Sequence, residues 1–324
     1  MSECPVPGDT ALLGPDQWRP RAAAHQRRVR TFLAGHRGPH PVWDFLFRYY
    51  GIRPGALLCW HAGYGFTLGG DQARRRYLGR TGYIGNPEGV TVSPAYLQRR
   101  HETVRFVGGL LDVTANRPAQ FNCFGMHEWA MVYRSAEVRH RTVPLRLGPA
   151  ATDAVVESTP LRCSHFDAFR FFSADAAPRN AVALTRRDQP QHEQPGCVHA
   201  NMDLYKWCAK LGPLVDSGLL MDCLELAADA RELDMRAGPY DLTGYGFRPI
   251  EVEQPAGRAQ YVRRQTEIAR RAAALRTALL GRCRSLVDIH QRDKAVVDQG
   301  TDRATSGDTG HRYPEATLLN GRID

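Results

Sequence analysis

The chain has 324 residues, of which 43% are apolar, so it is long enough to bury a substantial core. Its net charge of +9 would suit a polyanionic partner, but nearly all the basic residues are arginine, since only Lys206, Lys210 and Lys294 are lysines. This skew is typical of GC-rich coding, and a basic surface indicates nucleic acid only when its charges cluster. The charge alone therefore does not identify a DNA-binding protein.

The eight cysteines form no CxxC pair, and the chain opens without the charged and apolar regions of a secretory signal. No apolar run approaches the roughly 20 residues that a membrane-spanning helix needs. We therefore expect a reduced, cytoplasmic protein that neither spans a membrane nor is anchored to one.

Helical patterns outnumber strand patterns along the chain, and no repeat of constant period is present. We predict a mainly α fold with at most a small β element. The expected organisation is a flexible N-terminus over residues 1–15, a single helical domain over residues 16–290 and a disordered tail over residues 291–324.

The N-terminal half contains three predicted helices separated by loops. The Ala- and Arg-rich segment Arg21–Leu33 favours an amphipathic surface helix. The aromatic segment Val42–Tyr50 favours a buried helix, or alternatively a pocket wall. The glycine-rich stretch His61–Gly70 is predicted to be a loop, because its spacing differs from GxGxxG. Ser93 then provides an N-cap for a helix over Ala95–Leu111.

The middle of the chain is predicted to form shorter elements. Gly125 precedes a helical pattern, and Ala154–Glu157 is a candidate short strand. Ser164 is expected to cap a helix that runs to Phe172, with Asp167 acting in the manner of a capping box.

A long polar loop and two long helices complete the predicted fold. Residues 174–196 are rich in Pro, Gln, Arg and Asp, and long loops of this kind often form the walls of a site. Ser217–Met235 is a strongly amphipathic helix. The last predicted helix, Arg258 to about Ile289, is rich in Arg and Ala and is expected to be solvated.

Three segments carry imidazole and carboxylate groups close together in the sequence. They are His127-Glu128, His165-x-Asp167 and His199-x-x-x-Asp203. A divalent ion in an open site needs about three or four such ligands from separate elements, so the segments predict a non-haem iron or zinc site. The i, i+4 spacing of His199 and Asp203 places both on one face of a helix, within reach of one ion. The other two pairs diverge on a regular helix.

The same residues also fit structural roles. Asp167 can cap a helix, Glu128 can pair with an arginine, and His199 can form a hydrogen-bonded pair with Asp203. Against this, the stretch Cys197–Trp207 combines amide, carboxylate and ammonium groups with aromatic rings. A purely structural helix does not need that selection.

The cluster further fits hydrolysis of an N-glycosidic bond without a metal. A carboxylate, Asp203 or Asp167, can stabilise oxocarbenium-like charge or activate water, while aromatic rings stack on a base taken out of the helix. Because alkylated purines already carry positive charge, their departure needs little acid catalysis.

Four blocks of the sequence together resemble an actinobacterial family labelled 3-methyladenine DNA glycosylase, over roughly residues 15 to 285. The blocks are CFGMHEWAMVYR, CSHFDAFRFF, HANMDLYKW and LDMRAGPYDL. The resemblance implies DNA repair by excision of alkylated bases, with DNA as the partner and no cofactor. The chain departs from better-understood glycosylases, since it shows neither the glycine-rich hairpin of the helix-hairpin-helix type nor helical repeats. The resemblance therefore implies an activity without a mechanism.

The first functional hypothesis is a DNA glycosylase for alkylated bases, with Asp203 as the leading carboxylate and Asp167 in reserve. Glu128 and Lys206 are further catalytic candidates. The candidates for stacking, substrate binding or phosphate contact are Trp129, Tyr205, Trp207, Arg170, Asn201 and Lys210.

The second hypothesis is a helical enzyme that uses iron or zinc to act on a small molecule. Its pool of metal ligands comprises His127, Glu128, His165, His199 and Asp203. A third possibility, a non-catalytic helical protein with a satisfied polar core, predicts no pocket beside the cluster. The geometry of the cluster and of any cavity next to it distinguishes the three.

Overall fold

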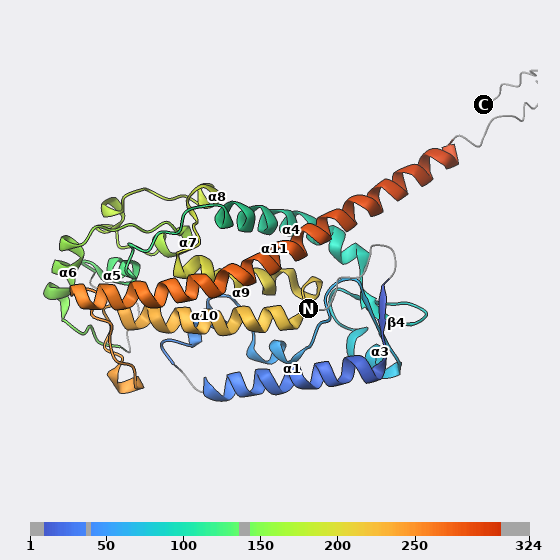
Figure 1. The fold of residues 1–324 in the computed structure, drawn as a ribbon, viewed down its shortest axis with the longest axis horizontal. Helices are drawn as coiled ribbons and strands as arrows, with labels where there is room; N and C mark the ends of the chain where they lie inside the picture. Colours follow the sequence, from blue (N-terminus) through green and yellow to red (C-terminus); the bar gives the residue numbers. More distant parts are fainter. Residues whose placement is uncertain (1–9, 37–39, 136–142, 306–324) are drawn as a thin grey trace, which may run out of the picture.

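The computed structural model describes residues 10–36, 40–135 and 143–305, with side chains up to residue 292. Within these ranges the chain is mainly α, as predicted, with eleven α-helices and one four-stranded sheet. Five long helices make up most of the body in Figure 1. They are α1 (Pro15–Gly35), α4 (Pro94–Ala115), α9 (Val198–Leu211), α10 (Ser217–Ala237) and α11 (Pro255–Thr305).

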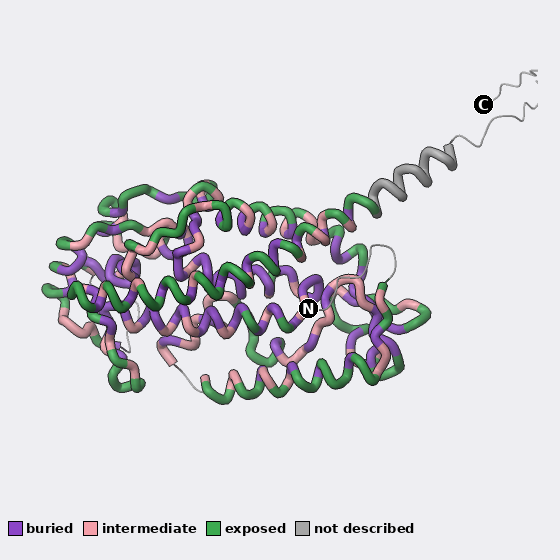
Figure 2. Tube along the Cα trace, viewed as in Figure 1, coloured by how far each residue is buried: buried purple, intermediate pink, exposed green. Residues whose placement is uncertain are grey.

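Helices α9 and α10 run through the middle of the body and carry much of its core. Helix α11 packs against α4, α9 and α10, while α1 contacts α10. Figure 2 shows that burial concentrates along α9 and α10, whereas α1 alternates between buried and exposed positions. Because α9 is covered on nearly all sides, even its polar residues Asn201, Asp203 and Lys206 are buried. Those groups must find partners inside the protein.

Local sequence signals separate α9 from α10. Gly212, which ends α9, adopts a φ of +59°, a conformation that glycine reaches without steric cost. The Asp216 carboxylate accepts a hydrogen bond of 3.0 Å from the Leu219 N–H and so caps α10. The short connection holds the two helices side by side.

The small sheet lies at the end of the body where α1 begins (Figure 1). Its strand order is β1-β2-β4-β3, with β1 parallel to β2 and the other pairs antiparallel. The strands are β1 (Ala11–Leu13), β2 (Phe66–Gly69), β3 (Tyr83–Gly85) and β4 (Gly89–Val92). One cluster of buried apolar side chains extends from Leu13 in this sheet to Leu286 in α11.

Short helices connect these elements, and among them α3 packs on β2 and β4, while α2 and α5 contact α10. The short α-helices are α2 (Asp44–Arg48), α3 (Asp71–Tyr77), α5 (Met126–Val132), α6 (Pro149–Ser158), α7 (Phe166–Phe169) and α8 (Gln189–His192). The 3-10 helices are η1 (Pro54–Leu58), η2 (Ala177–Arg179), η3 (Gly212–Leu214) and η4 (Thr243–Tyr245).

Two predicted elements have the wrong secondary structure. Ala154–Glu157, predicted to be a strand because of its adjacent valines, lies within helix α6, where Val156 is fully buried. Burial against a neighbouring element overrides the weak β preference of a β-branched residue. The predicted loop His61–Gly70 contains strand β2, in which Thr67 pairs with β4.

Other predicted elements differ in their ends. The aromatic segment Val42–Tyr50 is helical only over α2. Ala11–Leu13, part of the N-terminus that we expected to be loose, forms strand β1, while residues 1–9 lie outside the described residues. Helix α11 continues past Ile289 to Thr305, and residues 306–324 of the predicted tail lie outside the described ranges.

Gly89 of strand β4 has no room for a side chain, because an added Cβ would lie 2.0 Å from the carbonyl oxygen of Leu68. We expect Gly89→Ala to lower the free energy of unfolding by about 2 kcal/mol or more, since β2 and β4 must shift to relieve the overlap. Gly79→Ala is the control, because no atom lies within 4 Å of its added Cβ. Urea unfolding measures both variants, and equal stabilities would contradict this account of the sheet.

Candidate metal centre

The three segments singled out in the sequence meet in space. His127 comes from α5, His165 precedes α7, and His199 lies in the first turn of α9. The rings of His127 and His199 meet edge to face with centroids 4.1 Å apart, while those of His165 and His199 are stacked at 5.4 Å. The three imidazoles therefore form one continuous cluster.

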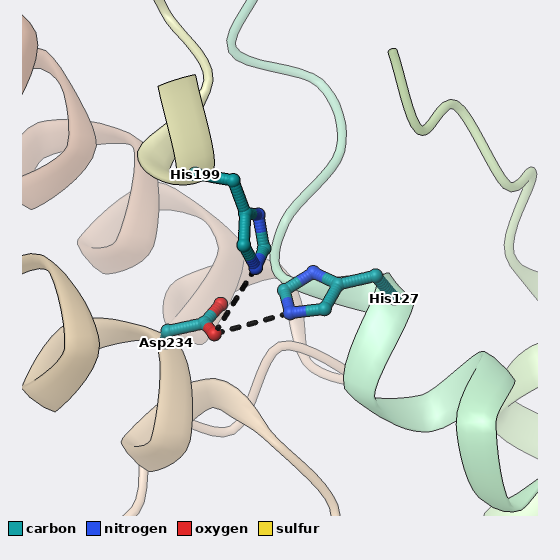
Figure 3. Close-up of side chains that lie close together, drawn as sticks. All are labelled: His127, His199 and Asp234. Carbon is teal, nitrogen blue, oxygen red and sulfur yellow. Dashed lines mark hydrogen bonds and ion pairs between the residues drawn. The ribbon is translucent and has the colours of Figure 1, made fainter. Parts of the chain in front are cut away.

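A first candidate triad consists of His127, His199 and Asp234, whose potential ligand atoms all lie within 4.8 Å of one another. Figure 3 shows both rings directed at the carboxylate of Asp234, which projects from α10. The distance from Asp234 Oδ2 is 3.1 Å to Nε2 of His127 and 3.7 Å to Nε2 of His199. The side chain of His199 is 12% exposed, while that of Asp234 is fully buried.

A second candidate triad consists of His165, Glu193 and Asp203, again with ligand atoms within 4.8 Å of one another. Nε2 of His165 lies 3.1 Å from Oδ2 of Asp203 and 3.7 Å from Oε2 of Glu193. All three side chains are buried. The residues come from the segment before α7, the segment after α8, and α9.

His199 and Asp203, which were expected to hold one ion, belong to different candidate triads among the described residues. They do share a face of α9, but each side chain contacts a partner on another element. His199 meets Asp234 of α10, whereas Asp203 meets His165 before α7.

Two buried cations offset the negative charge of the carboxylates. Nη1 of Arg231 donates hydrogen bonds of 2.7 Å to Oε1 of Glu128 and 3.1 Å to Oδ2 of Asp234. Nζ of Lys206 donates to Oδ2 of Asp203, and lies 3.3 Å from Oδ2 of Asp167. Buried charges persist only when they are paired in this way. Glu128 thus pairs with an arginine, Arg231, which is one of the roles predicted for it.

The neighbouring histidines of the first triad differ in charge. Burial disfavours the imidazolium of His127, but attraction to Asp234 and Glu128 outweighs burial and raises the pKa of His127 to about 9. Burial and the charge on His127 together hold the pKa of His199 well below its usual value. His127 is therefore protonated at neutral pH, and His199 keeps a free lone pair.

The carboxylates of the second triad are also separated in pKa. Burial opposes ionisation of Asp203, but Lys206 and His165 outweigh it and hold its pKa below the usual range. Burial raises the pKa of Glu193, because its cationic neighbours offset desolvation only in part. Environments that push the pKa values of neighbouring carboxyls apart are typical of reactive sites.

Asp167 is not a capping residue, contrary to the capping-box interpretation. Helix α7 begins at Phe166 with His165 as its N-cap, and no side chain caps it. The Asp167 carboxylate instead accepts hydrogen bonds of 2.5 and 3.2 Å from the two terminal nitrogens of Arg186. Arg186 belongs to the long polar segment that was predicted to form a site wall.

Two hollows adjoin the cluster. An outer cleft of about 630 Å³ lies next to Lys206 and Trp207. An inner cavity of about 40 Å³ is bordered by His165, Asp203 and His199, and so by members of both triads. Tyr49, Tyr50 and Asp167 line both spaces and form the wall between them.

The remaining predicted residues fall into two groups. Four line the outer cleft, namely Arg170, Lys206, Trp207 and Lys210. Three are buried away from it, namely Trp129, Asn201 and Tyr205. Trp129 donates a hydrogen bond of 2.8 Å to the Ala237 carbonyl, and Asn201 accepts one from Arg276. Tyr205 meets the ring of Tyr50 edge to face.

Sequence reasoning did not identify Asp234, Glu193, Arg231 or Arg186 as parts of the cluster. Asp234 and Arg231 occupy a regular amphipathic helix, where acidic and basic residues normally face solvent. Glu193 and Arg186 lie in a polar segment without periodicity. The weak signal was the block LDMRAGPYDL, which contains Asp234 and was recognised only as part of a resemblance.

Comparisons of the chain with protein-family models, with curated proteins and with solved structures find no match. Among the described helices, none combines the length and apolar character needed to cross a membrane.

The raised pKa of His127 predicts a pH dependence of stability. A group whose pKa rises from 6.5 to about 9 on folding stabilises the fold fully below pH 6.5 and loses that contribution as the pH rises through 9. We expect the metal-free protein to lose about 3 kcal/mol of unfolding free energy over this window. Denaturant unfolding at several pH values measures the loss.

Asp234→Asn is the matched variant, because it removes the charge that raises the pKa of His127 while keeping the size of the side chain. Its stability should fall much less between pH 6.5 and 9. Identical slopes in the variant and the parent protein would show that His127 does not carry the effect.

Proposed function

We propose that the chain is a metal-dependent enzyme that acts on a small organic molecule, with iron or zinc bound at the two triads. The observation that carries the proposal is the inner cavity, because His199 of one triad and His165 and Asp203 of the other border the same space. A cavity of about 40 Å³ has room for a few waters or a small reactant next to the ligands. A catalytic metal site requires such an open position.

The types of ligand support iron or zinc. Each triad combines imidazole nitrogen with carboxylate oxygen and no thiolate, a set that suits zinc and non-haem iron. Around the second triad, the Tyr50 hydroxyl donates a hydrogen bond of 3.0 Å to Oδ1 of Asp203. Burial raises the pKa of Tyr50 well above its usual value, so the hydroxyl stays a donor and can orient the carboxylate.

One buried polar atom of the first triad also supports the proposal. Within the described residues, Oδ1 of Asp234 has no hydrogen-bond partner. A buried polar atom left in that state costs about 1–3 kcal/mol. A metal ion on the free carboxylate oxygen of Asp234 would remove that cost on one side of the cluster.

Metal binding at the first triad has to compete with a proton. His127 is protonated at neutral pH, and only its neutral form can ligate a metal. The proposal therefore implies that ion binding releases a proton, and that the affinity rises with pH up to about 9.

Elemental analysis of protein purified without chelator tests the proposal, together with titration of the chelator-treated protein with Co²⁺. We expect stoichiometric iron or zinc, loss of the ion at the first triad in Asp234→Asn, and loss of the ion at the second in Asp203→Asn. Removing one of three ligands should weaken binding by about 100-fold or more.

Asp229→Asn is the matched control, because Asp229 lies on the same helix as Asp234 but its side chain is 48% exposed and pairs with Arg271. It should bind metal like the parent protein. A protein that holds no metal when purified and gives no Co²⁺ absorption up to pH 9 would refute the metal enzyme.

A DNA glycosylase for alkylated purines is the second candidate function, and the outer cleft favours it. Asp167 lies in that cleft beside the rings of Tyr49 and Trp207, with Arg170 and Lys210 also on its walls. This reading needs no cofactor. It assigns the carboxylate in the cleft to Asp167, because the leading candidate from the sequence, Asp203, borders the inner cavity instead.

Release of free 3-methyladenine from methylated DNA tests the glycosylase. Under this function we expect Asp167→Asn to lower release by at least about 100-fold, because one carboxylate would stabilise the positive charge of the transition state. Asp229→Asn should release the base at the parent rate. No release by the parent protein above the level of Asp167→Asn would refute this function.

Both functions assume a cytoplasmic protein. The seven cysteines within the described residues are free thiols, which agrees with a reducing compartment.

A further inference from the structure

The outer cleft is lined by more positive than negative side chains. Lys206, Lys210, Arg170 and Arg186 supply four cations, against the carboxylates of Asp167 and Glu102. Its volume of about 630 Å³ falls in the range of small-molecule sites. The cleft therefore favours a ligand of net negative charge.

Most of the negative charge in the cleft is already paired. Asp167 is held by Arg186 through two hydrogen bonds, and Arg170 lies 3.3 Å from the same carboxylate. Glu102, whose side chain is 83% exposed, lies 3.5 Å from Arg105. Asp167 also pairs with Lys206, so this one carboxylate is shared by three cations of the cleft and cannot neutralise them all.

The two lysines keep donors for a ligand. Within the described residues, Nζ of Lys206 donates to Asp203 and Asp167 and lies 4.2 Å from the centroid of the Trp207 ring, so a ligand can accept from the third of its three N–H groups only. Lys210 is exposed and has no carboxylate partner in the described part of the chain. Because they lie one helical turn apart on α9, their ammonium groups can contact the same anion.

Aromatic rings occupy the remaining wall. Phe106 is 45% exposed, although it is a large apolar side chain, and its ring meets Trp207 edge to face at 5.8 Å. Tyr49, half-buried, lies on the same cleft. Exposed rings beside the lysines of the cleft are suited to a ligand that has both a flat apolar part and an acid group.

We propose that the outer cleft binds a small aromatic anion, a carboxylate or a phosphate ester, with its acid group on Lys206 and Lys210 and its ring against Phe106. The inference names the substrate class of the proposed metal enzyme and rests on that function. The wall formed by Tyr49, Tyr50 and Asp167 places such a ligand next to the cavity that the triads border.

Calorimetric titration of the full chain tests this, with chelator-treated and Co²⁺-loaded samples measured separately. The probes are indole-3-acetate, phenyl phosphate, the neutral indole-3-acetamide and the ring-free acetate. We expect the aromatic anions to bind at least about tenfold more tightly than the amide or acetate. The amide lacks the charge-assisted hydrogen bonds, and acetate lacks the ring contact. Phenylacetate, which has the same ring as phenyl phosphate, is measured beside it, and the tighter of these two identifies the acid group. Added salt should weaken both.

Substitutions at the rim provide variants that leave the buried cluster unchanged. Lys210→Gln should weaken the aromatic anions about two- to fivefold while leaving the amide unaffected, because an exposed charge contributes modestly. Phe106→Leu should weaken indole-3-acetate and leave acetate unchanged. Arg270→Gln is the control, because Arg270 is exposed and pairs with Glu267 outside the cleft.

Equal affinity for indole-3-acetate and its amide overturns the inference, and so does the absence of binding by either aromatic anion in both samples. Metal-free protein that binds these anions but never binds Co²⁺ supports the cleft assignment and refutes the metal enzyme. Protein that binds Co²⁺ but does not prefer the aromatic anions supports the metal enzyme and refutes the cleft assignment.

Discussion

The neutralisation of buried carboxylates around α9 is the constraint on which the site depends. Asp203 and Asp234 are almost fully buried, and isolated buried charges are too costly to keep. Each is therefore surrounded by a cation and an imidazole: Lys206 and His165 around the first, Arg231 and His127 around the second. These contacts join α5 to α10 and the segment before α7 to α9. The same ion pairs thus hold the shorter segments against α9 and α10 and set the charges of the cluster.

The same arrangement separates two kinds of space. The inner cavity is small and bordered by imidazole and carboxylate groups, whereas the outer cleft is larger and lined by cations and rings. Buried groups whose pKa values are shifted in opposite directions are typical of catalytic sites. An open cleft lined by cations and rings is suited to binding a ligand. Because the cleft and cavity share the wall formed by Tyr49, Tyr50 and Asp167, the two proposals describe two parts of one site.

Sequence periodicity predicted the long helices because their apolar stripes repeat over many turns, as in Ser217–Met235 within α10. It failed for Ala154–Glu157, where two valines in a four-residue window resemble a strand as much as a buried helix. The convergence of His127, His165 and His199 was inferable from residue type, but their sorting into two triads was not. That sorting depends on Asp234 and Glu193, which reach the histidines only through tertiary packing and stand in unremarkable local sequence.

Lys206 links the two spaces, because it lines the cleft while its ammonium group donates to Asp203, a candidate ligand that borders the inner cavity. A cation bound to Asp203 would repel that ammonium towards the cleft, and an anion in the cleft would draw it away from Asp203. Under the two proposals, occupancy of either space would change the free energy of filling the other, and linkage requires the change to be equal in both directions. Through this one side chain, the affinity of the cleft for the organic ligand would depend on whether the inner site holds a metal ion.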